Sequence, residues 1–316
     1  MGFKARSADH RHLATSGGKP PRTKHQQGAQ KQDFDAKLRF ILNDRTRMRR
    51  LLMLEKKRRG LAAESLVFVG TKNLANYYWC AMQAVLISRK RSEEEMFFSV
   101  YIEDRLRYSF ELGFINSLPE DDGAILRIGD AISLTDIESL LKHRSDAPIE
   151  KDSSFSLDER IDMLEAWEKE HGTQSPFRRG EEAEAFVAEK YPTIRWNFAR
   201  GGYVIIGMPD GLTEDFVYEF KMVGKAAFAK FSRPVARAQA NLYGYFYHRP
   251  KRRLQFFLRD VRRVETEEGP VEIEHANATL AMFRAADAGE QPLPPKPWKC
   301  KTCPDDIKEQ CPIRQG

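Results

Sequence analysis

The sequence predicts an α/β protein in which a mixed sheet, flanked by helices, follows a mostly helical region. Apolar residues recur at helical spacing through most of residues 33–170, whereas amphipathic helices alternate with short apolar, β-branched segments after Pro176. The order helix, three strands, helix and strand in this second part favours a mixed sheet with helices on its faces. The length of 316 residues fits about two domains.

Composition divides the chain into four parts. Residues 1–32 almost lack aliphatic side chains, so we expect a disordered basic tail. Residues 33–170 form the expected helical region, which contains Cys80, and residues 171–291 form the expected sheet-containing core. A Pro-rich linker opens the last part, residues 292–316, which holds the other three cysteines.

Periodicity predicts the elements in order. Phe34, Leu38 and Ile41 begin a helical pattern, and the segment at residues 216–223 alternates aromatic residues as a strand does. The expected helices span residues 33–60, 61–87, 97–118, 134–141, 157–170, 180–191, 234–247 and 274–288. The expected strands span residues 194–198, 203–208, 216–223 and 254–258.

The formal net charge of +6 is distributed unevenly. Residues 1–59 hold 17 Lys and Arg against 5 Asp and Glu, a net charge of +12, so the rest of the chain carries −6. A basic segment of this kind either meets a polyanion or forms a solvated face. The basic residues that we expect to contact phosphates are Arg45, Arg49, Arg50, Lys56, Lys57, Arg58 and Arg59.

Two carboxylates and one amine form the most informative pattern. Asp210 follows one predicted strand, while Glu219 and Lys221 stand two apart on the next strand and therefore share a face. Neighbouring carboxylates attract a hard divalent cation, which makes bound water more acidic. A nearby lysine can stabilise charge that develops on a phosphate. The alternative is a surface hairpin in which Lys221 forms an ordinary salt bridge.

This pattern of Pro209-Asp210, eight residues and Glu219-x-Lys221 resembles the PD-(D/E)xK nuclease superfamily. Gln239 and Tyr243 resemble the Gln-x-x-x-Tyr motif of its RecB-like and Cas4-like members, although alone they would suit any helix with polar residues. The resemblance implies a restriction-endonuclease-like sheet. It also implies Mg²⁺ or Mn²⁺ bound by Asp210, Glu219 and the Phe220 carbonyl, with Lys221, Gln239 and Tyr243 as catalytic or substrate-supporting residues.

A first motif of the same family is matched near Gly180. The resemblance implies that Glu184, four residues later, completes the metal site. Glu181 is a competing ligand, and His171 lies too far upstream to match the histidine that the family often has. Glutamates also have an ordinary reason to stand in a first helical turn, because they interact favourably with the helix dipole.

The four cysteines are one distant thiol and three clustered thiols. Cys300 and Cys303 form a C-x2-C pair, Cys311 follows, and Cys80 lies far upstream. Three clustered cysteines and one distant cysteine suit a four-thiolate iron–sulfur cluster better than a zinc ribbon, but zinc and unpaired thiols remain alternatives. Cas4-like nucleases place one cysteine before and three after the core around a [4Fe–4S] cluster, and residues 74–80 resemble their first ligand helix.

The resemblance implies a metal-dependent DNA nuclease that hydrolyses phosphodiester bonds. The expected form is an exonuclease on single-stranded DNA or free ends, acting in DNA repair, recombination or CRISPR spacer acquisition. The chain has no P-loop motif, so a helicase is a plausible partner. One alternative is a Cas4-like DNA-binding assembly subunit that works with an integrase or helicase and cleaves little itself. A purely structural iron–sulfur module is a third hypothesis.

The composition argues against a membrane protein. Charged residues make up 31% of the chain, and no run approaches the 18 apolar residues of a membrane span. The first residues have no apolar signal core. We therefore expect a cytoplasmic protein in a reducing compartment, where clustered cysteines are more often metal ligands than disulfides.

Overall fold

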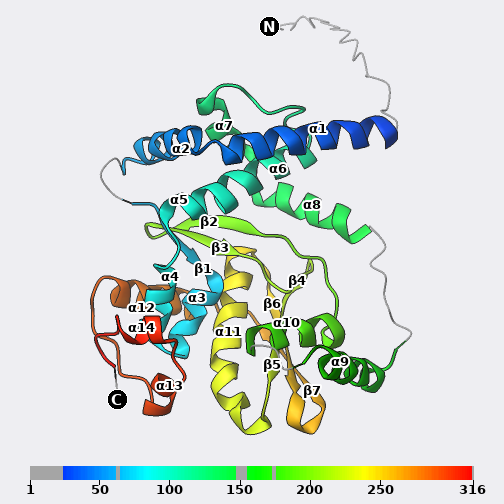
Figure 1. The fold of residues 1–316 in the computed structure, drawn as a ribbon, viewed down its shortest axis with the longest axis vertical. Coiled ribbons are helices and arrows are strands. Elements are labelled where there is room, and N and C mark those ends of the chain that lie inside the picture. Colours follow the sequence, from blue (N-terminus) through cyan, green and yellow to red (C-terminus); the bar gives the residue numbers. More distant parts are fainter. Residues whose placement is uncertain (1–23, 62–64, 147–154, 173–175, 315–316) are drawn as a thin grey trace, which may run out of the picture.

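The computed structural model describes residues 24–61, 65–146, 155–172 and 176–314, and these combine many helices with two small mixed sheets (Figure 1). The α/β class and the helices before the core are thus confirmed. The sheet differs from the prediction because two sheets are present instead of one.

Two N-terminal helices lie along one end of the molecule (Figure 1). They are α1 (Lys24–Asn43) and α2 (Arg45–Arg58), and Asp44 separates them by capping α2, since its side chain accepts a 3.0 Å hydrogen bond from the Arg47 N–H. The expected single helix is therefore two helices, and the first begins within the segment predicted to be disordered. The rest of that segment, residues 1–23, lies outside the described residues.

The apolar faces of these two helices pack on the helices that follow, in one cluster that includes Leu38, Leu51 and Phe97. The following elements are α3 (Thr71–Ala75), η1 (Asn76–Tyr78), α4 (Ala81–Ser88), α5 (Glu93–Met96), η2 (Phe97–Ile102), α6 (Glu103–Glu111), α7 (Asp122–Ile128), η3 (Gly129–Ala131) and α8 (Leu134–Asp146).

The first sheet has the strand order β1-β3-β2. β2 (Trp196–Arg200) and β3 (Tyr203–Gly207) form a hairpin whose two turn glycines, Gly201 and Gly202, have positive φ of 58° and 89°. β1 (Val67–Gly70) runs parallel to β3. The prediction of helix from residue 61 is therefore wrong over this strand, because pairing with β3, far along the chain, decides its conformation.

The second sheet has the order β4-β5-β6-β7. Its strands are β4 (Gly211–Leu212), β5 (Phe216–Val223), β6 (Lys251–Leu258) and β7 (Arg263–Pro270). β5 and β6 are parallel, and the other two pairs are antiparallel. β7 has no apolar alternation and was not expected. It is an edge strand whose Glu265 and Glu267 pair with Arg233 and Arg237 of a neighbouring helix.

Helices cover both faces of β5. Val217 and Val223 pack in the cluster that contains Leu242, whereas Tyr218 and Phe220 pack in the cluster that contains Val187. The helices of this half are α9 (Leu157–His171), α10 (Pro176–Val187), η4 (Ala226–Phe228), α11 (Ala229–Phe246), η5 (Arg259–Val261), α12 (Ile273–Asp287), α13 (Pro297–Lys301) and α14 (Asp305–Lys308).

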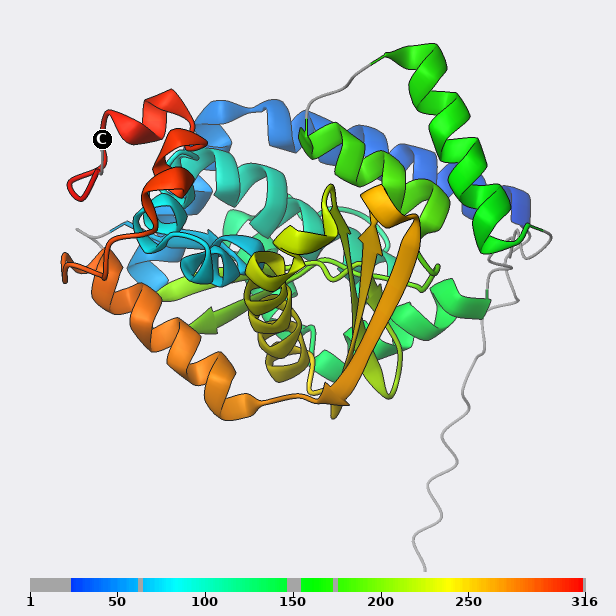
Figure 2. The same ribbon diagram turned by 90° about the horizontal axis from the view of Figure 1, so that it is seen from below.

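Helix α11 occupies the middle of the molecule. It lies between the second sheet on one side and α3 and α12 on the other, as both views show (Figures 1 and 2). Within the described residues, none of the helices combines the length and the apolar character that crossing a bilayer requires.

Candidate active site

A cavity of about 300 Å³ lies where β3, β5, α3, α10 and α11 meet. Strand alternation, the loop after β3 and one face of α11 all direct polar side chains towards it. All seven residues predicted for metal binding and catalysis line this cavity: Glu184, Asp210, Glu219, Phe220, Lys221, Gln239 and Tyr243. The structure therefore brings together residues that the sequence places up to 59 positions apart.

Strand β5 positions the acid and the amine. Glu219 and Lys221 project from the same face, and the Lys221 ammonium forms an ion pair with Oε1 of Glu219. Glu219 is only 1% exposed, and its Oε2 is a buried atom without a hydrogen-bond donor. A buried carboxylate oxygen with no partner is unfavourable, so the site favours an added cation or proton.

The Asp210 side chain is held by the backbone of strand β5. Its Oδ2 accepts a 2.8 Å hydrogen bond from the Phe220 N–H, which ties the loop after β3 to β5. The Phe220 side chain packs in the apolar cluster on the opposite face of the strand. At Gly207, an added Cβ would lie 3.3 Å from the Tyr243 ring, so the end of β3 lies close against α11.

Gln239 and Tyr243 of α11 are buried and hydrogen-bonded to each other. The Tyr243 hydroxyl donates a 2.9 Å hydrogen bond to the Met208 carbonyl and accepts one of 3.4 Å from Nε2 of Gln239. Oε1 of Gln239 is buried without a donor. Tyr243 therefore supports the loop that carries Asp210, which is a more specific role than the sequence indicated.

Glu184 lies in the last turn of α10, and the two competing residues lie elsewhere. Glu181 is exposed and is not among the described residues that line the cavity. His171 stacks on Trp167 with ring centroids 4.3 Å apart, and it is also outside the cavity. Among these three candidates, Glu184 is the one that the fold directs towards Asp210.

Burial and like charge shift the acids of the site. Burial, followed by the charge of Asp210, raises the pKa of Glu219 to about 8. The same two causes raise the pKa of Glu184. Burial alone would lower the pKa of Lys221, but the charges of Glu219 and Asp210 outweigh it, and the pKa is raised. All three pKa values are raised, as expected where several carboxylates lie close together.

Lys72 is a site residue that the sequence did not reveal. It belongs to α3, lines the cavity, and interacts electrostatically with Lys221, Glu219 and Asp210. The residue as a whole is exposed at the rim, but desolvation of its ammonium, followed by the charge of Lys221, lowers its pKa. α3 reaches the site because β1 pairs with β3, a contact that no local motif predicts.

Metal binding at the carboxylates requires side chains to reorient. In the described part of the chain, no group of three or more His, Cys, Asp or Glu side chains is arranged to hold a metal ion as it stands. One oxygen of Glu219 is paired with Lys221, and one oxygen of Asp210 is bonded to the Phe220 N–H. The other carboxylate oxygens, Oδ1 of Asp210 and the unpartnered Oε2 of Glu219, suit a hard cation such as Mg²⁺ or Mn²⁺.

The four cysteines line a second pocket (Figure 1 shows α4 beside α13 and α14). Cys80 caps α4, Cys300 lies in α13, and all four thiols are free. Lys299 donates a 2.7 Å hydrogen bond to the Trp79 carbonyl, and the Trp79 and Trp298 rings meet edge to face, so protein contacts already hold the two segments together.

Four thiols around one pocket are the donor set of a thiolate-bound group, although, among the described residues, no three of them are arranged to hold a metal ion as they stand. Burial and the neighbouring thiols raise the pKa of both Cys80 and Cys303. Four sulfur ligands suit iron–sulfur clusters and structural zinc alike. Both groups would favour the thiolate form that burial disfavours.

Most of the predicted phosphate-binding face of α2 forms ion pairs within the protein. Arg49 pairs with Glu94, Arg50 with Asp122, and Lys56 with Glu93. Arg58 and Arg59 both pair with Glu55, which is fully buried. Among the described residues, no carboxylate pairs with Arg45 or Lys57, so these two are the predicted cations whose charge is available to a ligand.

Comparisons with known proteins add little. No protein-family model matches the chain, and no curated protein matches it. Among solved structures, the crystal structure of SSO0001 is similar, with a TM-score of 0.35 and 15% sequence identity over 84% of this chain and 96% of that chain. A similarity this low defines neither fold nor function.

Proposed function

We propose that this protein is a metal-dependent DNA nuclease that hydrolyses phosphodiester bonds, in the form of an exonuclease on single-stranded DNA. One observation carries the proposal: Glu219, 1% exposed and with Oε2 unpartnered, shares a cavity with Asp210 and Lys221. Strongly perturbed acids grouped in a cavity are typical of catalytic sites. The proposal includes a restriction-endonuclease-like core made by the second sheet with α10 and α11.

In this proposal Asp210 and Glu219 hold Mg²⁺ or Mn²⁺, with the Phe220 carbonyl and Glu184 assisting. A bound divalent ion supplies Lewis acidity and lowers the pKa of its water. Lys221, which is paired with Glu219, would present its ammonium to the phosphate oxygens, where negative charge builds up. Tyr243 keeps the Asp210 loop in place through the Met208 carbonyl.

The proposal assigns a [4Fe–4S] cluster to Cys80, Cys300, Cys303 and Cys311. Its role is structural: it would join α4 to the C-terminal segment across a loop of more than 200 residues. The cluster takes no part in hydrolysis. A helicase partner remains part of the proposal, because the chain has no P-loop of its own, and an integrase partner belongs to the assembly-subunit alternative.

A cleavage assay with end-labelled single-stranded DNA and Mg²⁺ tests the nuclease proposal. We expect the wild-type protein to cut and Lys221→Ala to lose most of the activity. Lys225→Ala, which removes an exposed lysine four residues away, serves as the control and retains it. Equal cleavage by all three proteins, or none by any of them, contradicts catalysis by Lys221. DNA binding without cleavage favours the assembly-subunit hypothesis instead.

Metal binding is measured separately from activity. Calorimetric titration of the metal-free protein with Mn²⁺ is expected to show a site that Asp210→Asn and Glu219→Gln both weaken. Asp215→Asn, an exposed carboxylate between the two, is the matched control and leaves Mn²⁺ affinity unchanged. Unchanged affinity in the first two variants contradicts the assignment of these residues as ligands.

A further inference from the structure

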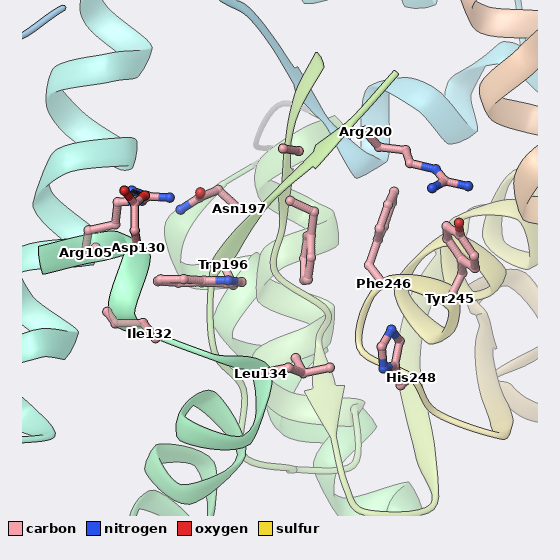
Figure 3. Close-up of a pocket in the computed structure, with 13 residues that line it drawn as sticks. Arg105, Asp130, Ile132, Leu134, Trp196, Asn197, Arg200, Tyr245, Phe246 and His248 are labelled. Atoms are coloured by element: carbon pink, nitrogen blue, oxygen red, sulfur yellow. Dashed lines mark hydrogen bonds and ion pairs between the residues drawn. The ribbon is translucent and has the colours of Figure 1, made fainter. Parts of the chain in front are cut away.

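A groove of about 470 Å³ crosses the edge strand β2, outside the site described above (Figure 3). Arg105 and Asp130 form one end of the groove, and Tyr245, Phe246 and His248 form the other. The two ends therefore differ in character, the first being polar and the second mainly aromatic.

The polar end holds two buried donors without acceptors. Nε of Arg105 and Nδ2 of Asn197 are both buried and unpartnered, and Asn197 is 7% exposed. In Figure 3 the Asn197 amide points towards Arg105 and Asp130. Buried donors without acceptors destabilise a fold, so the end of the groove suits a ligand that supplies acceptor oxygens.

The position of Arg105 is built into the fold. Its guanidinium lies 4.1 Å from the Tyr101 ring centroid, and Nη1 is 3.0 Å from Oδ1 of Asp130. A Cβ on Gly129 would lie 2.4 Å from Cδ of Arg105. The absence of a side chain at Gly129 is therefore what allows Arg105 to occupy this end of the groove.

The other end presents ring faces and a second cation. The Arg200 guanidinium lies 5.7 Å from the Tyr245 ring centroid, and no carboxylate of the described residues pairs with it. Phe198 and Phe246 stack with centroids 5.0 Å apart. Aromatic faces beside an uncompensated guanidinium are the combination that binds unpaired bases and their phosphates.

The groove and the candidate active site share helix α11, and strand β2 of the groove pairs with β3, which borders the active site. Helix α11 contributes Tyr243 to the active-site cavity and Tyr245 to the groove. Trp196 of the groove pairs in β2 with Gly207, at the end of the strand that leads to Asp210. The groove and the carboxylates are therefore connected through α11 and through the pairing of β2 with β3.

We propose that this groove binds an unpaired nucleotide of a single DNA strand. Acceptor oxygens reach Arg105 and Asn197, the base lies against Tyr245, and Arg200 neutralises a phosphate. This inference rests on the proposed nuclease function and extends it to the path of the strand. An extended peptide added to the β2 edge is the other conceivable occupant. The DNA strand is favoured over the peptide because it supplies acceptor oxygens for the two unpartnered donors and negative charge for Arg200.

Binding to a fluorescein-labelled oligothymidylate tests the groove, with the full chain in EDTA so that no cleavage occurs. We expect Tyr245→Ala and Arg200→Glu each to weaken affinity about tenfold. Arg263→Glu, on the remote strand β7, makes the same charge change and should have little effect. Thermal melting shows whether each variant is folded, and Gly129→Ala provides a second route by displacing Arg105.

Cross-linking locates the strand independently of affinity. Irradiation of a bromodeoxyuridine oligonucleotide bound to the unmodified protein should give adducts at Tyr245 or Trp196. Free thymidine monophosphate in excess should compete for the same cross-links, because the groove takes one nucleotide. Cross-links at Tyr245 or Trp196 that persist in this excess would count against a nucleotide site.

Unchanged affinity in folded Tyr245→Ala and Arg200→Glu, together with cross-links elsewhere, overturns the groove proposal. The cleavage assay keeps this failure apart from that of the nuclease proposal. Binding and groove cross-links without any Mg²⁺-dependent cleavage would refute the nuclease alone. Cleavage that requires Lys221 but is unchanged in the groove variants would refute the groove proposal alone.

Discussion

The Phe220 N–H donates a 2.8 Å hydrogen bond to Oδ2 of Asp210. This bond joins the loop after β3 to the strand that carries Glu219 and Lys221, so the two acids come from neighbouring segments whose spacing is set by the backbone. Because the donor is a main-chain group, every residue except proline can supply it at position 220. The site is therefore organised by the sheet as much as by its side chains.

Stability of the metal-free protein should depend on the protonation of Glu219. Its pKa is raised from 4.5 to about 8 in the folded state, chiefly by burial. Between these values the folded protein keeps a proton that the unfolded chain releases, so the free energy of unfolding falls as pH rises. In Glu219→Gln, the free energy of unfolding should decrease much less over this pH range. Melting temperatures measured in EDTA across this window check it, and parallel curves for both proteins would contradict it.

Removal of the Tyr243 hydroxyl should loosen the Asp210 loop. Tyr243→Phe leaves the Met208 carbonyl without its donor, and we expect a loss of about 1 kcal/mol in the free energy of unfolding. If Tyr243 positions Asp210, Mn²⁺ affinity falls as well. Denaturant unfolding and calorimetry measure the two effects. A loss of stability with unchanged Mn²⁺ affinity would show that the hydroxyl is structural only.

The charge of Lys72 should weaken Mn²⁺ binding and promote DNA cleavage. Its ammonium lies near Lys221 and the carboxylates, so Lys72→Ala removes positive charge that opposes a bound cation. We expect tighter Mn²⁺ binding and slower cleavage, since a phosphate loses a cation. Lys72→Arg keeps the positive charge, so both cleavage and Mn²⁺ affinity should return towards their wild-type values. A variant that weakens Mn²⁺ binding would contradict this account of Lys72.

The cysteine pocket should hold iron. Cys300→Ser is expected to abolish visible-range absorbance and to lower the melting temperature, because a thiolate ligand is lost from the junction of α4 and α13. Iron and zinc contents, measured by elemental analysis, identify the metal. A colourless wild-type protein that contains zinc would replace the iron–sulfur assignment with a structural zinc site.

The basic face of α2 should separate into structural and ligand-binding cations. Arg59→Ala removes one of the two arginines that pair with the buried Glu55, which also accepts a hydrogen bond from the Tyr101 hydroxyl, and should destabilise the protein by about 2 kcal/mol. Lys57→Ala should leave stability unchanged and, if this face meets DNA, reduce the salt dependence of binding. Denaturant unfolding and salt titrations measure these effects. Equal destabilisation by both variants would argue against this division.

The prediction of β5 and of the helix that bears Gln239 and Tyr243 succeeded because both patterns are local. Aromatic alternation along residues 216–223 and helical periodicity in α11 are visible without any knowledge of the fold. The alternation also places Glu219 and Lys221 on one face. β7 was missed because its sequence is charged, and its partner strand and the arginines of α11 stabilise it.

The sequence by itself determined which polar residues to consider as a site: the acids and lysine around β5, the polar pair on α11, and the grouping of three cysteines after the core. Tertiary structure alone decided that β1 pairs with β3, which brings Lys72 to the carboxylates. It also decided that most of the α2 arginines and lysines serve as internal ion-pair partners, and that the groove at β2 exists. The reason is physical, since local periodicity encodes which face of an element is buried, whereas contacts between distant segments depend on how those faces pack.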